Sequence, residues 1–256
     1  MIHIALCGAL GRMGGEVARA ILEQDDLKVL VAVEAQGHRG IGTAVGETVV
    51  VSSLVDHIGE ADVVVDFTNP EGAVRHLSVA ADHGVPAVIG VTALNERQRA
   101  DVEKASSRIP VVYAPNMSVG VNLLFKLVAE TAAVLNEGYD VEIVEMHHRM
   151  KKDAPSGTAA KIADIVSTAR GGCKHVYGRQ GLVGERKGEE IGIHALRGGD
   201  VVGEHTVVFA GGGERLEITH KASSRRTFAS GVIKAIRFVH QRTPGLYDMN
   251  DVLGLR

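Results

Sequence analysis

The sequence has few cysteines and no long apolar run. Its 256 residues include only two cysteines, Cys7 and Cys173, which is typical of a protein kept in a reducing cytosol and not of a disulfide-stapled secreted domain. No apolar stretch approaches the ~18 residues that a membrane span needs, and the first residues lack the basic segment of a signal peptide. We therefore expect a cytoplasmic protein with no membrane partner.

An excess of positive charge is also missing. The 28 lysines and arginines stand against 31 aspartates and glutamates, giving a formal net charge of −3, whereas a nucleic-acid-binding domain shows a basic face. Repeats and low-complexity segments are absent as well, and 45% of the residues are hydrophobic. The chain is expected to fold around a full core and to bind a small molecule, not a nucleic acid.

The first half of the chain alternates strands and helices. Short runs rich in valine and isoleucine, typical of buried parallel strands, cover residues 1–7, 27–35, 61–68, 83–92 and 109–116. Helical spacing of apolar residues covers 15–24, a polar-faced helix covers 94–106, and Asn69-Pro70 begins another helix. This order predicts an α/β domain whose parallel sheet is covered by helices on both faces.

The first strand is followed by a glycine-rich turn. Gly8, Gly11 and Gly14 form a GxxGxxG pattern, and such glycines let the backbone approach a pyrophosphate at a helix N-terminus. Glu34 lies about twenty residues further on, at the end of the second strand, where an acid accepts the ribose hydroxyls of a dinucleotide. We interpret the turn as a dinucleotide site; the alternative is a packing turn that binds nothing.

The second half follows a different pattern. Helices are predicted at 118–136, 157–169 and 226–242, a strand at 139–148, a loop at 170–189, and an antiparallel meander at 191–199, 201–213 and 214–222. Consecutive strands predict a second, α+β domain. We place the first domain at residues 1–118 and the second at 119–225, with residues 226–256 returning to the first.

Residues 145–159, EMHHRMKKDAPSGTA, gather positive charge beside a helix start. If His147 and His148 end a strand, their side chains point to opposite faces, so one can exchange a proton while the other hydrogen-bonds a substrate. Lys151 can donate a proton or hold an anion. The pattern predicts a cradle for a small polyanion, although a solvated basic loop would look similar.

The helix start completes this cradle. Ser156 is a good N-cap, and the backbone N–H groups of Ser156, Gly157 and Thr158 are expected to point outward from the helix N-terminus. Such a terminus is a ready site for a carboxylate.

These motifs resemble a known family. EMHHRMKKDAPSGTA, together with GALGRMG at 8–14, DFTNP at 66–70, APNMSVGVN at 114–122 and GEHTVVFAGGGERLEITHKASSRRTFASG at 203–231, is similar to the signature of the 4-hydroxy-tetrahydrodipicolinate (dihydrodipicolinate) reductases. These are nicotinamide-dependent enzymes of diaminopimelate and lysine biosynthesis. They reduce a cyclic dicarboxylate with loss of water, by hydride transfer from NADH or NADPH.

The resemblance implies a Rossmann-type domain joined to a substrate domain with a mixed, largely antiparallel sheet, assembled as a homotetramer without a metal. It implies that His147 is the general acid/base and Lys151 the proton donor, and that the substrate carboxylates are held by His148, Gly157 and Thr158. The implied cofactor residues are Gly8, Ala9, Leu10, Gly11, Arg12, Met13, Glu34, Gly90, Val91, Thr92, Ala114, Pro115, Asn116 and Met117.

Two positions depart from the family pattern. The usual Gly-Thr-Thr-Gly is here Gly90-Val91-Thr92-Ala93, which removes one hydroxyl. Many relatives place an arginine after the strand-two acid to meet the 2′-phosphate of NADP, but this chain has Ala35 there, and Glu34 repels a phosphate. We therefore favour NADH, while His38 and Arg39 nearby leave NADPH open.

Other functions are weighed against this one. An aspartate-semialdehyde dehydrogenase needs a nucleophilic cysteine, and neither cysteine lies in a promising context; the Glu-Lys-Pro motif of sugar oxidoreductases is absent. A non-catalytic NAD sensor would be expected to lose its proton donors. A zinc site at His194, His205 and His220 is a further alternative. The roles of Arg225 and Arg226 stay open.

Overall fold

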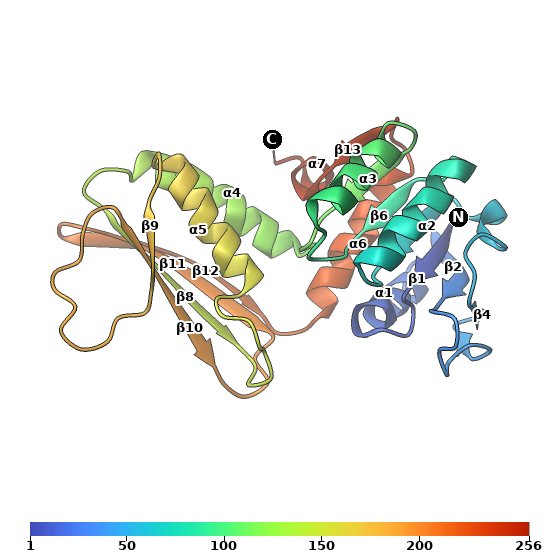
Figure 1. The fold of residues 1–256 in the computed structure, drawn as a ribbon, viewed down its shortest axis with the longest axis horizontal. Helices are drawn as coiled ribbons and strands as arrows, with labels where there is room; N and C mark the ends of the chain where they lie inside the picture. The colour runs from blue at the N-terminus through green and yellow to red at the C-terminus, as the bar shows by residue number, and fades with distance from the viewer. Residues whose placement is uncertain (256) are drawn as a thin grey trace. The chain divides into compact units, whose positions relative to one another are not determined.

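The computed structural model describes residues 1–255 and divides the chain into two compact units (Figure 1). The first unit consists of Met1–Val119 together with the chain from Arg225 onward, and the second of Gly120–Ser224. None of the helices described is long and apolar enough to cross a membrane.

The first unit is built on an eight-stranded sheet in the order β13-β7-β6-β5-β1-β2-β4-β3. All neighbouring strands are parallel except the β3–β4 hairpin. The strands are β1 (Ile2–Cys7), β2 (Leu27–Val33), β3 (Ala44–Val45), β4 (Thr48–Val51), β5 (Val63–Asp66), β6 (Ala87–Ile89), β7 (Pro110–Tyr113) and β13 (Gly245–Tyr247). The predicted parallel sheet is confirmed.

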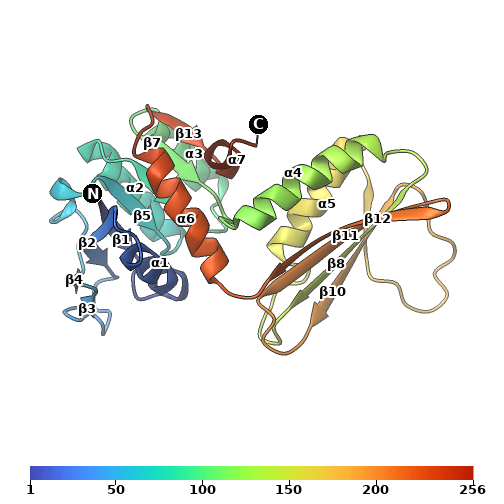
Figure 2. The ribbon, with the colours of Figure 1, turned by 180° about the vertical axis from the view of Figure 1, so that it is seen from behind.

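Helices cover both faces of this sheet, which explains its continuous apolar strands. Ile4 and Leu6 of β1 belong to a core shared with α1 (Arg12–Leu22) and α6 (Arg226–Val239), whereas Ala5 and Cys7 belong to one shared with α2 (Pro70–His83) and α3 (Glu96–Ser106). Figures 1 and 2 show these helix pairs on opposite sides of the sheet. Because successive strand residues point to opposite faces, a strand covered on both sides buries every residue.

The first helix begins earlier than the apolar spacing predicts. It starts at Arg12 and not at residue 15, so Gly14 lies inside its first turn. A Cβ on Gly14 would lie 1.9 Å from the carbonyl oxygen of Gly8, so the third glycine lets the helix pack directly on the turn. The start of α2 is as predicted, since Asn69 accepts from Gly72 N and Pro70 is the first helical residue.

Several short elements escape the sequence pattern. No element was predicted at β3, β4, β13, η1 (Ile58–Glu60) or α7 (Met249–Leu253). These segments of two to five residues are too short for the sustained apolar periodicity that identifies a helix or strand. The capping box at Asp248 and Asp251 is a local signal that identifies α7.

The second unit has a five-stranded mixed sheet in the order β12-β11-β8-β10-β9. Its strands are β8 (Asp140–His147), β9 (Lys174–Tyr177), β10 (Glu190–Arg197), β11 (Gly203–Gly211) and β12 (Glu214–Ala222). The predicted meander is wrong in one respect: β11 and β12 form an antiparallel hairpin, but β10 pairs in parallel with β8, which lies between β10 and β11. The segment 170–189, predicted as a loop, contains β9, which is parallel to β10.

Among residues 1–255, the helices of this unit lie on one face of its sheet (Figure 1). Residues of α4 (Val119–Val134) and α5 (Gly157–Ala169) share a core with β8, β10 and β11, in which Val207 and Phe209 are fully buried. The opposite face presents Val144 and Leu196, which are 36% and 45% exposed. The unit therefore has one apolar face closed by helices and one open face.

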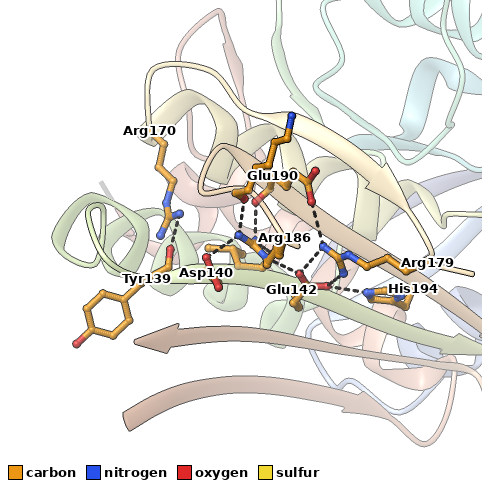
Figure 3. A network of polar contacts seen from close by, with 10 residues as sticks. Tyr139, Asp140, Glu142, Arg170, Arg179, Arg186, Glu190 and His194 are labelled. Atoms are coloured by element: carbon orange, nitrogen blue, oxygen red, sulfur yellow. Dashed lines mark hydrogen bonds and ion pairs between the residues drawn. The ribbon is translucent and has the colours of Figure 1, made fainter. Parts of the chain in front are cut away.

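Glu142 ties the loop after β9 to the open face (Figure 3). Its carboxylate accepts from both guanidinium NH groups of Arg179, at 2.8 and 3.0 Å, from Arg186 Nε at 2.9 Å, and lies 2.7 Å from His194 Nε2. Burial raises the pKa of Glu142, but the hydrogen bonds from Arg179, His194 and Arg186 outweigh it and lower the pKa to about 2. This residue is a structural anchor for residues 179–186.

Ala93 carries backbone strain in the loop after β6. It has φ of 61°, a left-handed conformation that favours glycine, and it occupies the position where the resembled family carries glycine. Its side chain is exposed, so nothing in the packing offsets the conformational cost of about 1 kcal/mol.

We expect Ala93→Gly to stabilise the protein, because glycine adopts this φ without strain and only part of the gain is lost to unfolded-chain entropy. The midpoint of thermal unfolding, followed by circular dichroism, should rise by about 2–4 °C. Ala100→Gly is the matched control: Ala100 is exposed within α3, where the same change should destabilise by about 1 kcal/mol. A lower midpoint for Ala93→Gly would contradict the strain.

Candidate active site

The predicted cofactor residues lie at one edge of the first unit's sheet. The turn of residues 8–13 follows β1, Glu34 follows β2, residues 90–92 follow β6 and residues 114–117 follow β7. Because β1, β2, β6 and β7 are parallel members of one sheet, their carboxyl ends meet at the same edge, which is where open α/β sheets bind ligands.

Glu34 and the glycine turn are in direct contact. Leu10 N donates to a carboxylate oxygen of Glu34 at 2.7 Å, and Gly8 N donates to the carbonyl of Val33 at 2.8 Å. Gly8 has φ of 79°, and a Cβ there would lie 2.9 Å from the carbonyl oxygen of Phe67. The turn needs glycine at this position for both reasons, and the acid is placed beside it.

A cavity of about 590 Å³ opens next to this turn. Arg12, Arg19 and Arg225 all line it, and Arg19 pairs with Glu16. This places Arg225, whose role the sequence left open, beside the glycine turn. The positive charge around the cavity suits an anionic ligand.

Packing explains two of the residues in the loop at 90–93. Val91 is 4% exposed and packs in the core with α2 and α3, so its side chain faces inward. A Cβ on Gly90 would lie 2.1 Å from the ring of Phe67, which explains the glycine. The ring of Phe67 at this position was not anticipated from the sequence.

In the second unit, a strand ends within the segment at residues 145–159, at His147, as predicted. His147 is the last residue of β8, 8% exposed, and His148 follows it half-buried. Lys151 Nζ donates to both carboxylate oxygens of Asp153 at 2.9 Å. Asp153 was not recognised from the sequence, although it lies only two positions from the lysine.

His147 is held by a buried carboxylate that the sequence did not reveal. Its Nδ1 lies 2.6 Å from Oε2 of Glu145, which is fully buried. Both guanidinium NH groups of Arg197 donate to the same carboxylate, at 2.8 and 2.9 Å, and Ser156 N donates to it at 3.0 Å. Glu145 therefore connects the end of β8 to β10 and to the start of α5.

The hydrogen bond from Ser156 N to Glu145 bears on the carboxylate site predicted at the N-terminus of α5. Ser156 caps α5, since its hydroxyl accepts from Ala159 N at 3.1 Å, as predicted. Its own backbone N–H donates to Glu145 and does not point outward to a ligand, contrary to the prediction. Gly157 and Thr158 occupy the first turn of the helix.

Burial disfavours the charged form of two histidines at this site, His147 and His205. Burial lowers the pKa of His147, although the hydrogen bond to Glu145 works in the opposite direction. His205 is 3% exposed, and burial together with His147 lowers its pKa to about 4. Its Nε2 lies 3.1 Å from the Ser156 hydroxyl and its ring is edge-on to that of His147, with centroids 5.2 Å apart.

The alternative sites are not assembled. Cys7 is fully buried and burial raises the pKa of its thiol well above the usual value, so it is no nucleophile. His205 and His220 are paired across β11 and β12, but His194 lies on β10, beyond β8, against Glu142. Among the described residues, the group close enough to hold a metal ion is Cys7, Asp66 and His76.

Comparison with known proteins agrees with these features along the whole chain. Residues 2–117 match the family model for the N-terminus of dihydrodipicolinate reductase, and residues 120–253 match the model for its C-terminus. A 4-hydroxy-tetrahydrodipicolinate reductase from Methanocaldococcus jannaschii is 48% identical, covering 100% of this chain and 98% of that protein. One from Nitrosomonas europaea is 46% identical, covering 100% and 99%.

Solved structures also resemble this chain. A dipicolinate-bound dihydrodipicolinate reductase from Paenisporosarcina sp. TG-14 has a TM-score of 0.81 at 26% identity, with 98% of both chains covered. A myo-inositol dehydrogenase from Corynebacterium glutamicum has a TM-score of 0.60 at 16% identity, covering 100% of this chain and 93% of that one, and shares the fold alone. The resemblance seen in the sequence is thus confirmed, and the chain belongs to the dihydrodipicolinate reductase family of oxidoreductases.

Proposed function

We propose that His147 and Lys151 supply the proton chemistry by which this chain reduces 4-hydroxy-tetrahydrodipicolinate to tetrahydrodipicolinate. The family's reaction consumes a hydride from NADH or NADPH and a proton, breaks a C–O bond and releases water, in the diaminopimelate and lysine pathway. The observation that carries the proposal is the placement of His147, which is fixed by Glu145 next to Lys151 and to the N-terminus of α5.

The substrate is a dicarboxylate, and the surroundings of His147 suit one. Gly157 begins α5, and the positive end of a helix dipole favours an anion at that point. We assign the carboxylates to His148, Gly157 and Thr158. Lys151 now pairs with Asp153, and an incoming carboxylate competes for that ammonium group. The planar dicarboxylate dipicolinate in the Paenisporosarcina structure supports this chemistry.

The cofactor site is proposed at the sheet edge of the first unit. Backbone N–H groups of residues 8–13 would hold the pyrophosphate, while Glu34 would exchange its hydrogen bond from Leu10 for ribose hydroxyls. Residues 90–92 and 114–117 would line the nicotinamide side. The bound nicotinamide supplies the hydride. Such a reaction on a soluble metabolite is consistent with the cytoplasmic location that the cysteine usage predicts.

The reaction can be tested by coupling the purified protein to a dihydrodipicolinate synthase with pyruvate and aspartate semialdehyde. Oxidation of the nicotinamide cofactor should be fast for the parent chain and fall about 100-fold or more in His147→Ala, because general acid–base catalysis contributes about 10²–10⁴-fold. Loss of absorbance at the reduced-nicotinamide band measures it.

His175→Ala is the matched control, because His175 lies on edge strand β9 and its ring contacts Tyr177. It should retain parental activity. No oxidation by the parent with either cofactor would contradict the proposed activity, and equal rates for parent and His147→Ala would contradict the role of His147.

We further propose that NADH is the preferred cofactor. Ala35 presents only a methyl group beside Glu34, and His38 is occupied within its own loop, where its Nδ1 accepts from Gly40 N at 3.1 Å. Arg39, in the same loop, is exposed.

Ala35→Arg should raise kcat/KM for NADPH about 10-fold relative to NADH, because a guanidinium can bind the 2′-phosphate. Initial rates with each cofactor measure the ratio, and Gln36→Arg, one position further along the exposed loop, serves as control. A parent chain that prefers NADPH would contradict the proposed selectivity.

Finally, we propose that the open face of the second unit is where copies associate into the expected homotetramer. Val144, on the central strand β8, and Leu196 on β10 are exposed on a face that none of the described helices of this unit covers. Exposed apolar side chains on an uncovered sheet face favour association between copies.

Light scattering should give a molar mass near four times 27.1 kDa for the parent. Val144→Lys should lower it, because an interface cannot leave a buried ammonium unpaired. Val134→Lys, at the 81% exposed end of α4, should leave it unchanged. A parent mass of one chain would overturn the assembly.

A further inference from the structure

The carboxylate of Glu145 is fully buried and accepts four hydrogen bonds. Oε2 accepts from His147 Nδ1 and one NH group of Arg197, and Oε1 accepts from Ser156 N and the other NH group of Arg197. An ionised carboxylate can only accept hydrogen bonds, so all of its neighbours must be donors. Nδ1 of His147 therefore carries a hydrogen in both the neutral and the charged ring.

This arrangement leaves Nε2 as the nitrogen that gains or loses a proton. Nε2 points to Gly203 of β11, where an added Cβ would lie 3.0 Å away. Glycine at this position spares Nε2 the close contact that any side chain would make. The ring is thus held by a hydrogen bond at Nδ1, with the backbone of Gly203 facing Nε2.

We propose that Glu145 is a positioning residue for the reaction: it fixes His147 with hydrogen on Nδ1 and its lone pair on Nε2, and it anchors the start of the substrate-binding helix to the same carboxylate. The inference rests on the proposed role of His147. It adds a residue that touches neither substrate nor cofactor and acts through its two neighbours.

Arg197 offsets the charge of Glu145, so that His147 can still release a proton while bonded to this carboxylate. A lone buried carboxylate would hold the imidazole permanently protonated, whereas the bidentate guanidinium neutralises that charge. The charged and titratable groups facing His147 are Glu145 on its own strand, Arg197 on β10, His205 on β11 and Lys151 in the following loop. Burial lowers the pKa of His147, Glu145 raises it, and Lys151 and Arg197 lower it again.

Glu145→Gln should reverse the tautomer. Arg197 donates to both oxygens, but the second donor at Oε1 is the backbone N–H of Ser156, which cannot become an acceptor, whereas the second donor at Oε2 is His147, which can change its tautomer. The amide oxygen will therefore occupy the Oε1 position, and the amide NH2 will face His147 Nδ1 at the loss of one hydrogen bond from Arg197. Nδ1 must then accept, which moves the hydrogen to Nε2 and lowers the pKa of the ring. We expect kcat to fall by up to about 10⁴-fold, the loss known for a wrong histidine tautomer in a serine protease, with KM changed less than 3-fold.

Two readouts separate this inference from the proposed function. Imidazole ¹⁵N–¹H spectra of ¹⁵N-histidine-labelled protein report the tautomer and pKa of His147 without substrate, with His147→Ala assigning the signal. Glu142→Gln is the matched control: it removes a carboxylate with arginine and histidine partners from the same strand, but on the other face, and should leave the His147 spectrum unchanged.

Arg197→Met gives a test of opposite sign. Without its arginine the buried carboxylate is no longer neutralised, so the pKa of His147 should rise and the Nδ1–H tautomer should persist. This variant decides the matter if Glu145→Gln does not fold. An Nε2–H tautomer in the parent, or no change in the His147 pKa in either variant, would overturn the inference. An inactive parent with the expected spectra would instead contradict the proposed function alone.

Discussion

The buried carboxylate of Glu145 is the constraint on which the second unit's site depends. A charge without solvent must be paired and hydrogen-bonded, because an unpaired one costs several kcal/mol. Arg197 from β10, the backbone of Ser156 and the ring of His147 must therefore converge on one point. Three segments of the second unit are thus brought together by a requirement that any buried acid imposes.

The first unit meets a different constraint, the close approach of backbone to backbone. Gly14 lets α1 lie on the carbonyl of Gly8, which brings the helix N-terminus to the carboxyl end of β1. Any side chain at Gly14 would push the helix dipole and its N–H groups away from the proposed site of the pyrophosphate. In both units these contacts are made by residues that lie in a helix or strand or directly beside one.

Local patterns in the sequence predicted the features that are local in the structure. The parallel strands, the caps at Asn69 and Ser156 and the placement of His147 at a strand end all follow from periodicity or neighbouring residues. The insertion of β8 between β10 and β11 does not, because strand order depends on pairings between distant segments. The Glu145–Arg197 pair, 52 residues apart, is hidden for the same reason. The family motif includes Glu145, but no local rule says that a strand glutamate faces a core.

Strand β8 carries two similar carboxylate clusters, one on each face of the sheet, because successive strand residues point to opposite faces. Glu142 and Glu145 are three residues apart and lie on opposite faces, and each binds a guanidinium in bidentate geometry and a histidine. On the open face, Glu142 holds a loop, and its histidine, His194, is a further anchor (Figure 3). On the helix-covered face the same combination lies beside the N-terminus of α5, because Glu145 also accepts from Ser156 N. The two clusters share their chemistry, and they differ in that the one at Glu145 has a helix N-terminus next to it, which favours an anion.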